Sequence, residues 1–236
     1  MRELNLLDLD KFPNQLGLVG FTSAEAEERV SKFELKEQKA NVTRVEKEIK
    51  WPKFVKYMWA YIFKNHGIPE QQVFYKGYLK CHEEFIKKQK LTKKEEDGLE
   101  GRIYRAFTSL IRDVIFSLQL KEILTKHGVE VIYNVQLDLR GVDILLIHDN
   151  KKYALELFVD TKNSRYWRKI KEGRNSKFDH VKHIEMPLPV GGRRKLNNIW
   201  MYGEIDFDRV NIQLSLCEGA QSTNPEPGDE NFWEDF

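Results

Sequence analysis

The chain has 236 residues, enough for one large domain or for a medium-sized domain with a smaller companion. Its 41% hydrophobic residues can fill a packed interior and its 32% charged residues can cover the surface, so wholesale disorder is excluded. The net charge of +2 is small and by itself points to no particular partner.

No segment of the sequence predicts a membrane span. Arg112 and Asp113 interrupt the longest apolar stretch well before the ~18 uninterrupted apolar residues that a span needs. The first residues include acids and lack a secretory cleavage site, so we expect a cytoplasmic protein. Cys81 and Cys217 lie far apart, which argues against a disulfide scaffold and against a structural zinc site.

The charges are unevenly distributed along the chain. Between Lys151 and Lys195 there are thirteen lysines and arginines but five acidic residues, and no basic residue follows Arg209. The chain therefore has a basic middle and an acidic end, which favours a polyanionic partner for the middle part.

The first part of the chain predicts helices. Thr22 or Ser23 can cap a helix whose first turns are rich in acids, which suits the positive end of the helix dipole. Residues 54–63 repeat aromatic and aliphatic side chains at helical spacing, and Gly67 ends this second helix. We expect its aromatic stripe to face a core.

A different pattern begins near Gly98. The strongly charged residues 82–98 predict a solvated helix and a linker, whereas residues 100–124 predict one long amphipathic helix, because their apolar side chains recur at steps of three and four. We therefore expect a helical N-terminal module over residues 1–97, a second domain over residues 98–215 and an acidic flexible tail over residues 216–236.

Strand-like runs follow the long helix. Residues 129–139, 142–149 and 151–160 predict three strands, the last two joined by a tight turn at Asp149 and Asn150. A basic helix over residues 163–174 and further strands over residues 180–189 and 198–206 come next. The order from Glu100 is helix, three strands, helix, strand, which predicts a mixed α/β fold of the α+β type.

The hairpin turn decides which residue lies opposite Asp143, at the start of the middle strand. A two-residue turn pairs Asp143 with Glu156. A four-residue loop instead places Asp143 opposite Phe158, between Glu156 and Asp160. Glu156 lies close to Asp143 in either case.

One face of the third predicted strand is acidic. Side chains alternate along a strand, so Glu156 and Asp160 share a face with Ala154 and Phe158, while the intervening leucines and valine face the core. Carboxylates gathered on one face repel one another unless a cation lies between them, and oxygen ligands suit Mg²⁺ or Mn²⁺.

This pattern resembles the PD-(D/E)xK nuclease superfamily, whose restriction-endonuclease-like core runs helix, three strands, helix, strand. In that family an acid opens the second strand and an acid-x-Lys triplet lies in the third. Asp143 matches the first acid, although Val142 replaces the usual proline. The resemblance covers residues 100–206 and implies a Mg²⁺- or Mn²⁺-dependent endonuclease that cuts DNA.

Two candidates match the triplet. Glu156 has the better hairpin register, but Phe158 occupies its lysine position; Asp160 is followed correctly by Lys162 but lies further along the strand. We prefer Glu156 as the second metal-binding acid, keep Asp160 as the alternative, and take Lys162 as the displaced amine. The resemblance also makes Glu100, at the head of the long helix, an accessory acid.

Basic residues near these acids are candidates for contacts with phosphates. The candidates in the basic helix and the following loop are Arg165, Arg168, Lys169, Lys171, Arg193, Arg194 and Lys195. For the loop with Arg193, Arg194 and Lys195, an ordinary solvated turn explains the sequence as well as a phosphate contact does. A helix cap is the plainer interpretation of Asp160.

The tail permits a second interpretation of the function. It is acidic but contains Phe232, Trp233 and Phe236, which suit docking to a protein partner, folding back over the basic groove, or packing on its own domain. The alternative to a nuclease active in defence or mobile-element processing is therefore a catalytically inactive subunit of the same fold that binds nucleic acid or a protein.

Overall fold

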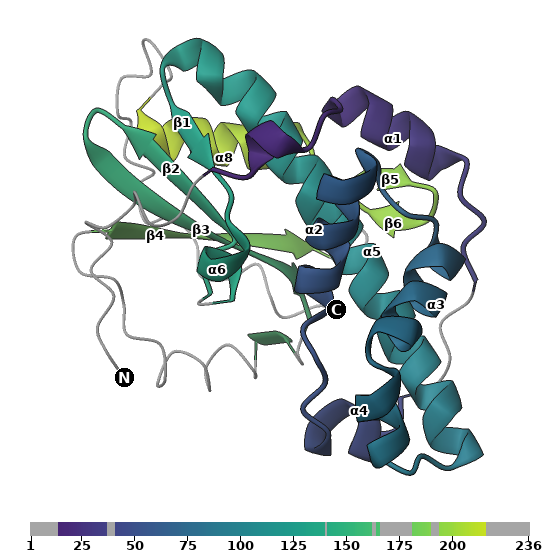
Figure 1. Cartoon of the computed structure of the whole chain (residues 1–236). Coiled ribbons are helices and arrows are strands. Elements are labelled where there is room, and N and C mark those ends of the chain that lie inside the picture. The colour runs from purple at the N-terminus through teal and green to yellow at the C-terminus, as the bar shows by residue number, and fades with distance from the viewer. Residues whose placement is uncertain are drawn as a thin grey trace, which may run out of the picture.

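The structure is a computed structural model that describes residues 14–36, 41–139, 141–161, 164–165, 181–189 and 194–215. These residues form a mixed α/β fold in which a four-stranded sheet lies at one end of a long helix (Figure 1). None of the helices within these ranges combines the length and the apolar character that crossing a membrane requires.

Short helices and helical turns make up the first part of the chain. They are η2 (Leu16–Leu18), α1 (Ser23–Ser31), η3 (Arg44–Glu48), α2 (Phe54–Asn65), α3 (Gln71–Cys81) and α4 (Glu83–Lys88). Thr22 caps α1, as one of the two expected residues: Glu25 N donates to its hydroxyl, and its own N–H donates to the Glu25 carboxylate at 2.7 Å.

The long helix α5 (Lys93–Leu124) begins earlier in the chain than the sequence predicts. A second capping box starts it, in which Thr92 N donates to the Glu95 carboxylate at 2.8 Å. The expected domain boundary near Gly98 therefore falls inside the first turns of α5. The turn η4 (Thr125–His127) and Gly128, whose φ is +71°, end the helix as expected.

The sheet contains β1 (Glu130–Ile132), β2 (Ile144–His148), β3 (Lys151–Asp160) and β4 (Val181–Pro189), in that spatial order. β1, β2 and β3 form an antiparallel meander, and β4 pairs with β3 in parallel over the full length of β4. The predicted strands over residues 142–149, 151–160 and 180–189 are confirmed.

Two strand predictions are wrong in part. The strand predicted over residues 129–139 stops at Ile132, and α6 (Val135–Asp138) follows because the Asn134 side chain accepts a hydrogen bond from Gln136 N and caps a helical turn. The segment 198–206 keeps only β6 (Ile199–Trp200), which pairs with β5 (Lys195–Leu196). The helix α8 (Glu204–Leu214) then begins, and Asp206 caps it by accepting from Gly203 N at 2.9 Å.

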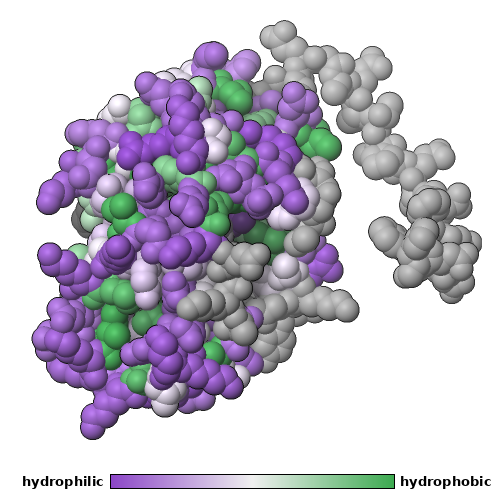
Figure 2. Space-filling view, turned by 90° about the vertical axis from the view of Figure 1, so that its right-hand side faces the viewer, coloured by the Kyte–Doolittle hydropathy of each residue, from purple (hydrophilic) through white to green (hydrophobic). Residues whose placement is uncertain are grey.

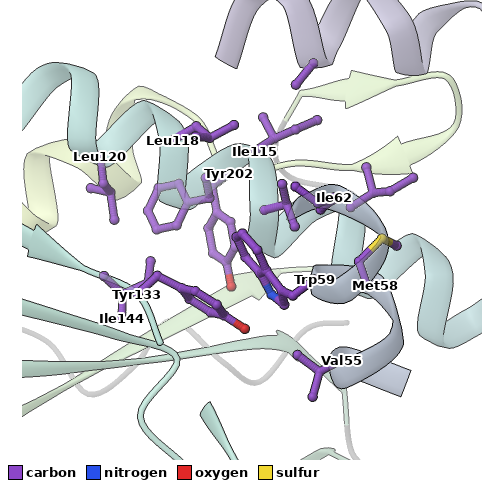
Figure 3. Close-up of a cluster of buried hydrophobic side chains, with 14 of the residues drawn as sticks. Val55, Met58, Trp59, Ile62, Ile115, Leu118, Leu120, Tyr133, Ile144 and Tyr202 are labelled. Atoms are coloured by element: carbon purple, nitrogen blue, oxygen red, sulfur yellow. The ribbon is translucent and has the colours of Figure 1, made fainter. Parts of the chain in front are cut away.

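One hydrophobic core connects the helices with one face of the sheet. It includes Trp59 of α2, Ile115 of α5, Ile144 of β2 and Tyr202 beside α8, all almost fully buried (Figure 3). A smaller cluster lies on the other face of the sheet, where α6 covers it: Ile132, Leu137, Val142, Leu145 and Ala154. Side chains of the first part of the chain therefore pack in the same core as the sheet.

Candidate metal centre

The β2–β3 hairpin has the two-residue turn, and Asp143 lies just beyond its regular ladder. Asp149 and Asn150 have φ values of +48° and +60°, as a two-residue type I′ turn requires. The ladder runs from His148 opposite Lys151 to Ile144 opposite Leu155. Asp143 N donates to Leu155 O at 3.0 Å, one residue away from the expected partner, so the predicted turn is confirmed but the pairing of Asp143 with Glu156 is not seen.

Glu156 lies on the face of the sheet that turns away from the main core. Leu155 belongs to the main core, whereas Ala154 and its cross-strand partner Leu145 belong to the smaller cluster on the opposite face. Side chains two residues apart share a face, so Glu156 lies with Ala154. The expected alternation of acidic and core faces on β3 is confirmed.

The carboxylate of Asp143 is held in place but lies in an unfavourable environment for a negative charge. Leu157 N donates to its Oδ2 at 2.6 Å. Burial raises the pKa of Asp143 well above its usual range, and the negative charges of Asp138, Asp113 and Glu156 raise it further. We call these four carboxylates the acidic centre.

Asp138 and Asp113 reach the acidic centre from two helices. Tyr133 donates its hydroxyl to Asp138 Oδ2 at 3.0 Å, and its ring stacks on Trp59 of α2 at 3.9 Å. Asp113 lies on α5, where burial raises its pKa and the adjacent guanidinium of Arg112 lowers it. Arg112 Nε donates to Asp113 Oδ1 at 3.2 Å, so the negative charge of Asp113 has a cationic partner.

His183 of β4 contacts the acidic centre through Glu156. Its Nδ1 lies 3.2 Å from Glu156 Oε1. In the parallel β3–β4 register His183 lies beside Ala154 and Glu185 lies beside Glu156, so this part of β4 presents its polar side chains on the same face as Glu156.

The side chains of the acidic centre fit a hard divalent cation in their chemistry. Within the described ranges, no three His, Cys, Asp or Glu side chains gather closely enough to enclose an ion by themselves. Mg²⁺ does not need such a cage, because it typically keeps several waters and takes one or two protein carboxylates together with phosphate oxygens of a substrate. Asp143 and Glu156 suit that role, because a cation would relieve the repulsion that raises the pKa of Asp143.

Asp160, the alternative second acid, is engaged elsewhere. Arg165 donates two hydrogen bonds to its carboxylate, from Nε to Oδ1 at 2.5 Å and from Nη2 to Oδ2 at 2.6 Å. This guanidinium lowers the pKa of Asp160. Asp160 also lies four residues beyond Glu156, about 13 Å along the strand.

Glu100, the expected accessory acid, also lies away from the acidic centre. It precedes Asp113 by thirteen residues, which corresponds to about 20 Å along α5. Its carboxylate accepts a hydrogen bond from the hydroxyl of Tyr104 at 2.6 Å, and Gln72 donates to the same hydroxyl at 2.5 Å. The acid that α5 contributes to the centre is Asp113.

The described candidates for phosphate contacts are partnered within the protein. Besides Arg165, Arg194 pairs with Glu27 of α1 through two hydrogen bonds, at 2.5 and 3.0 Å. Lys195 Nζ lies 4.2 Å from the ring centroid of Trp200. The remaining candidates lie outside the described residues, as does the acidic tail: Lys162, Arg168, Lys169, Lys171 and Arg193.

Sequence reasoning missed three members of this site. Asp113 left a signal, because it and Arg112 interrupt the apolar run of a predicted helix. Asp138 left no signal of its own, because it lies in the segment 129–139 that predicts a strand. His183 lies in the predicted strand over residues 180–189, but the sequence does not say which strand pairs with that strand.

Comparisons with models of protein families, with curated proteins and with solved structures found no match to this chain.

Proposed function

We propose that this protein is a metal-dependent nuclease that hydrolyses phosphodiester bonds in DNA. The observation that carries the proposal is the carboxylate of Asp143, to which Leu157 N donates at 2.6 Å and whose pKa is raised by burial and by the charges of Asp138, Asp113 and Glu156. An arrangement that concentrates negative charge without a cation is costly for stability, and such sites are typical of metal-dependent reaction centres.

The order of the elements supports the same proposal. From α5 to β4 the chain forms a helix, an antiparallel meander of three strands and a fourth strand, with the short helix α6 inserted between β1 and β2. Apart from α6, this is the order that the resemblance to PD-(D/E)xK nucleases implies. The resemblance also implies a helix between the third and fourth strands, and Ser164 and Arg165 are helical at the start of that segment.

Each residue of the centre has a proposed role. Asp143 and Glu156 would hold one or two Mg²⁺ or Mn²⁺ ions. The bound ion would polarise a phosphate oxygen and lower the pKa of a coordinated water. The N–H of Leu157 fixes the Asp143 carboxylate and His183 fixes that of Glu156, so that both ligands are oriented before the ion binds.

Lys162 is the proposed amine of the reaction. Phe158 occupies the position at which the resemblance implies a lysine, so the positive charge that orients the attacking water must come from another part of the chain. Lys162 is the lysine nearest to β3 in the sequence after that strand. Its replacement by alanine is expected to slow cleavage while leaving metal binding unchanged.

A cleavage assay with matched variants tests the proposal. The full chain is incubated with labelled single- and double-stranded DNA in Mg²⁺ or Mn²⁺, beside Asp143→Asn, Glu156→Gln and, as a control, Glu130→Gln. Glu130 is an exposed carboxylate on β1 of the same sheet. We expect the first two variants to lose at least about a hundredfold in rate, the size usual for the loss of one electrostatic group from a reaction centre. The control should cut like the wild type.

The same assay separates the nuclease from the alternative. A wild-type protein that binds DNA but cuts neither form with either metal ion would contradict the proposal and favour the catalytically inactive binding subunit. Cleavage that survives in both Asp143→Asn and Glu156→Gln would show that the reaction occurs elsewhere in the molecule.

A further inference from the structure

The helices α2 and α3 carry an excess of positive charge that the expected phosphate contacts do not include. Between Ile49 and His82 the sequence has six lysines and one acidic residue, Glu70. Five of the lysines are exposed side chains on the two helices or at their start; Lys64 lies near the end of α2, and the other four are Lys53 and Lys56 at the start of α2 and Lys76 and Lys80 on α3. We call these four residues the lysine surface.

Ring contacts join the two helices where the four lysines lie. Phe54 and Tyr57 of α2 pack on Tyr78 of α3, with ring centroids 4.7 and 6.0 Å apart. Tyr57 also lies so close to Gly77 that its hydroxyl oxygen is 1.8 Å from the place a β-carbon would take. Each lysine of the surface is one or two residues along its helix from one of these contacts and is exposed, so the backbone places all four around the contact between α2 and α3.

One lysine of the surface has an acidic neighbour, Glu83: the pair of Glu83 with Lys87 at 2.6 Å lowers the pKa of the Glu83 carboxyl, and the charge of Lys80 helps to lower it. Within the described ranges, the ion pairs of the first hundred residues involve other basic side chains, such as Lys32, Arg44 and Lys87. The side of the molecule on which α1 and α3 lie is covered mainly by hydrophilic side chains (Figure 2). Such a group of exposed lysines suits the phosphates of a nucleic acid, whose binding releases counterions.

The position of α2 connects this surface with the acidic centre. Trp59 of α2 stacks on Tyr133, and Tyr133 donates its hydroxyl to Asp138 of the centre. Lys56 is three residues before Trp59, on the neighbouring part of the helix surface. A helix with its side chains is about 10–12 Å across, so one strand of nucleic acid can reach both sides of α2.

We propose that the lysine surface binds the phosphate backbone of the nucleic acid on which the protein acts, an inference that rests on the proposed nuclease function. The lysines bind without base specificity, because they present charge and no fixed hydrogen-bonding pattern towards base edges. The partner is a nucleic acid and not a second protein, since four like charges in one patch match a regular polyanion.

Binding measured without metal tests this inference separately from cleavage. Fluorescence anisotropy of labelled duplex and single-stranded DNA is recorded in EDTA for the wild type and for a variant with glutamine at the four lysines of the surface. A matched control carries glutamine at Lys93, Lys94, Lys126 and Lys151, which are exposed elsewhere. Both variants lose four positive charges, so any difference in their DNA binding comes from where the lysines lie and not from the net charge.

The variant of the lysine surface is expected to bind at least about tenfold more weakly than the control at moderate salt. The dependence of log K on log salt should fall by about 0.9 for each duplex phosphate contact that is lost. Arginine at the same four positions should restore binding, which excludes misfolding as the cause.

Three results would overturn the inference. They are equal binding by the glutamine variant and the control, no binding of DNA by the wild type, and a lysine-dependent attachment to anionic lipid vesicles with DNA binding unchanged. A wild type that binds through these lysines but never cuts would contradict the proposed nuclease activity and leave the binding surface in place. Cleavage by a wild type whose DNA binding does not depend on these lysines would support the nuclease activity and contradict the binding surface.

Discussion

Replacing Asp143 by asparagine should stabilise the metal-free protein at neutral pH. Asparagine keeps an oxygen that can accept the hydrogen bond from Leu157 N, but it removes the negative charge. The repulsion from Asp138, Asp113 and Glu156 disappears with that charge. The wild-type protein therefore gives up stability to keep a carboxylate where a cation can bind.

The sign of the pH dependence follows from the raised pKa. In the unfolded chain the aspartate has a pKa of about 3.9, and in the folded protein the pKa of Asp143 is higher. The folded state then binds more protons between the two values, so the wild type loses stability as the pH rises through this window. The advantage of Asp143→Asn should grow over the same window and vanish below about pH 4.

The expected size is about 1.4 kcal/mol for each unit by which folding raises the pKa. For a chain of this length, 1 kcal/mol corresponds to a shift of about 2–4 °C in Tm. Chemical and thermal denaturation in EDTA at neutral and acidic pH measures the difference, with Asp208→Asn, an exposed aspartate of α8, as the control. An asparagine variant that is less stable than the wild type at neutral pH would refute the reasoning.

Three further predictions follow from the contacts of the site and the core. Replacement of His183 by alanine should raise the Mn²⁺ concentration needed for half-maximal cleavage by about 10–100-fold, because the Glu156 carboxylate loses its contact with the imidazole. Replacement by asparagine should preserve most of the affinity for Mn²⁺. Equal values for the wild type and both variants would exclude a role of His183 in orienting Glu156. Asp160→Asn should cut like the wild type, since Asp160 pairs with Arg165, and a loss as large as that of Glu156→Gln would restore Asp160 as the second acid. Phe107 is fully buried in the main core, so Phe107→Ala should lower the free energy of unfolding by about 3–5 kcal/mol and leave one cooperative unfolding transition. Different unfolding transitions by circular dichroism and by tryptophan fluorescence would instead indicate independent domains.

The local part of the site could be predicted from the sequence. The turn residues Asp149 and Asn150 fix the hairpin register, and strand alternation then assigns Glu156 to the face opposite the main core. Both steps use neighbours in the chain, and for this reason they succeeded. The same counting does not reach Asp143, because its N–H donates to Leu155 O, out of the regular register. The choice of Glu156 over Asp160 agrees with the ion pair that engages Asp160.

The distant members could not be predicted, because packing and not periodicity brings them together. Helical spacing predicts that Asp113 interrupts an apolar face, but it does not say which turn of α5 lies near Asp143. Glu100 was expected only because the resemblance implies an acid at the head of the helix. His183 approaches Glu156 through the parallel pairing of β4 with β3, which joins segments that are far apart in the sequence.

Helix signals compete with strand signals near the site. The alternation of residues 129–139 predicts one strand, but the Asn134 cap converts its second half into α6 and brings Asp138 to the centre. Capping depends on one side-chain hydrogen bond, which a count of apolar spacing does not register.

Binding of Mn²⁺ to the purified full chain, followed by electron paramagnetic resonance, tests most directly whether these carboxylates hold a divalent cation. The wild type and Glu130→Gln should bind with the same affinity, Asp143→Asn and Glu156→Gln should bind at least about tenfold more weakly, and Mg²⁺ should compete. Equal affinity in all four proteins would contradict the assignment of the metal centre to Asp143 and Glu156.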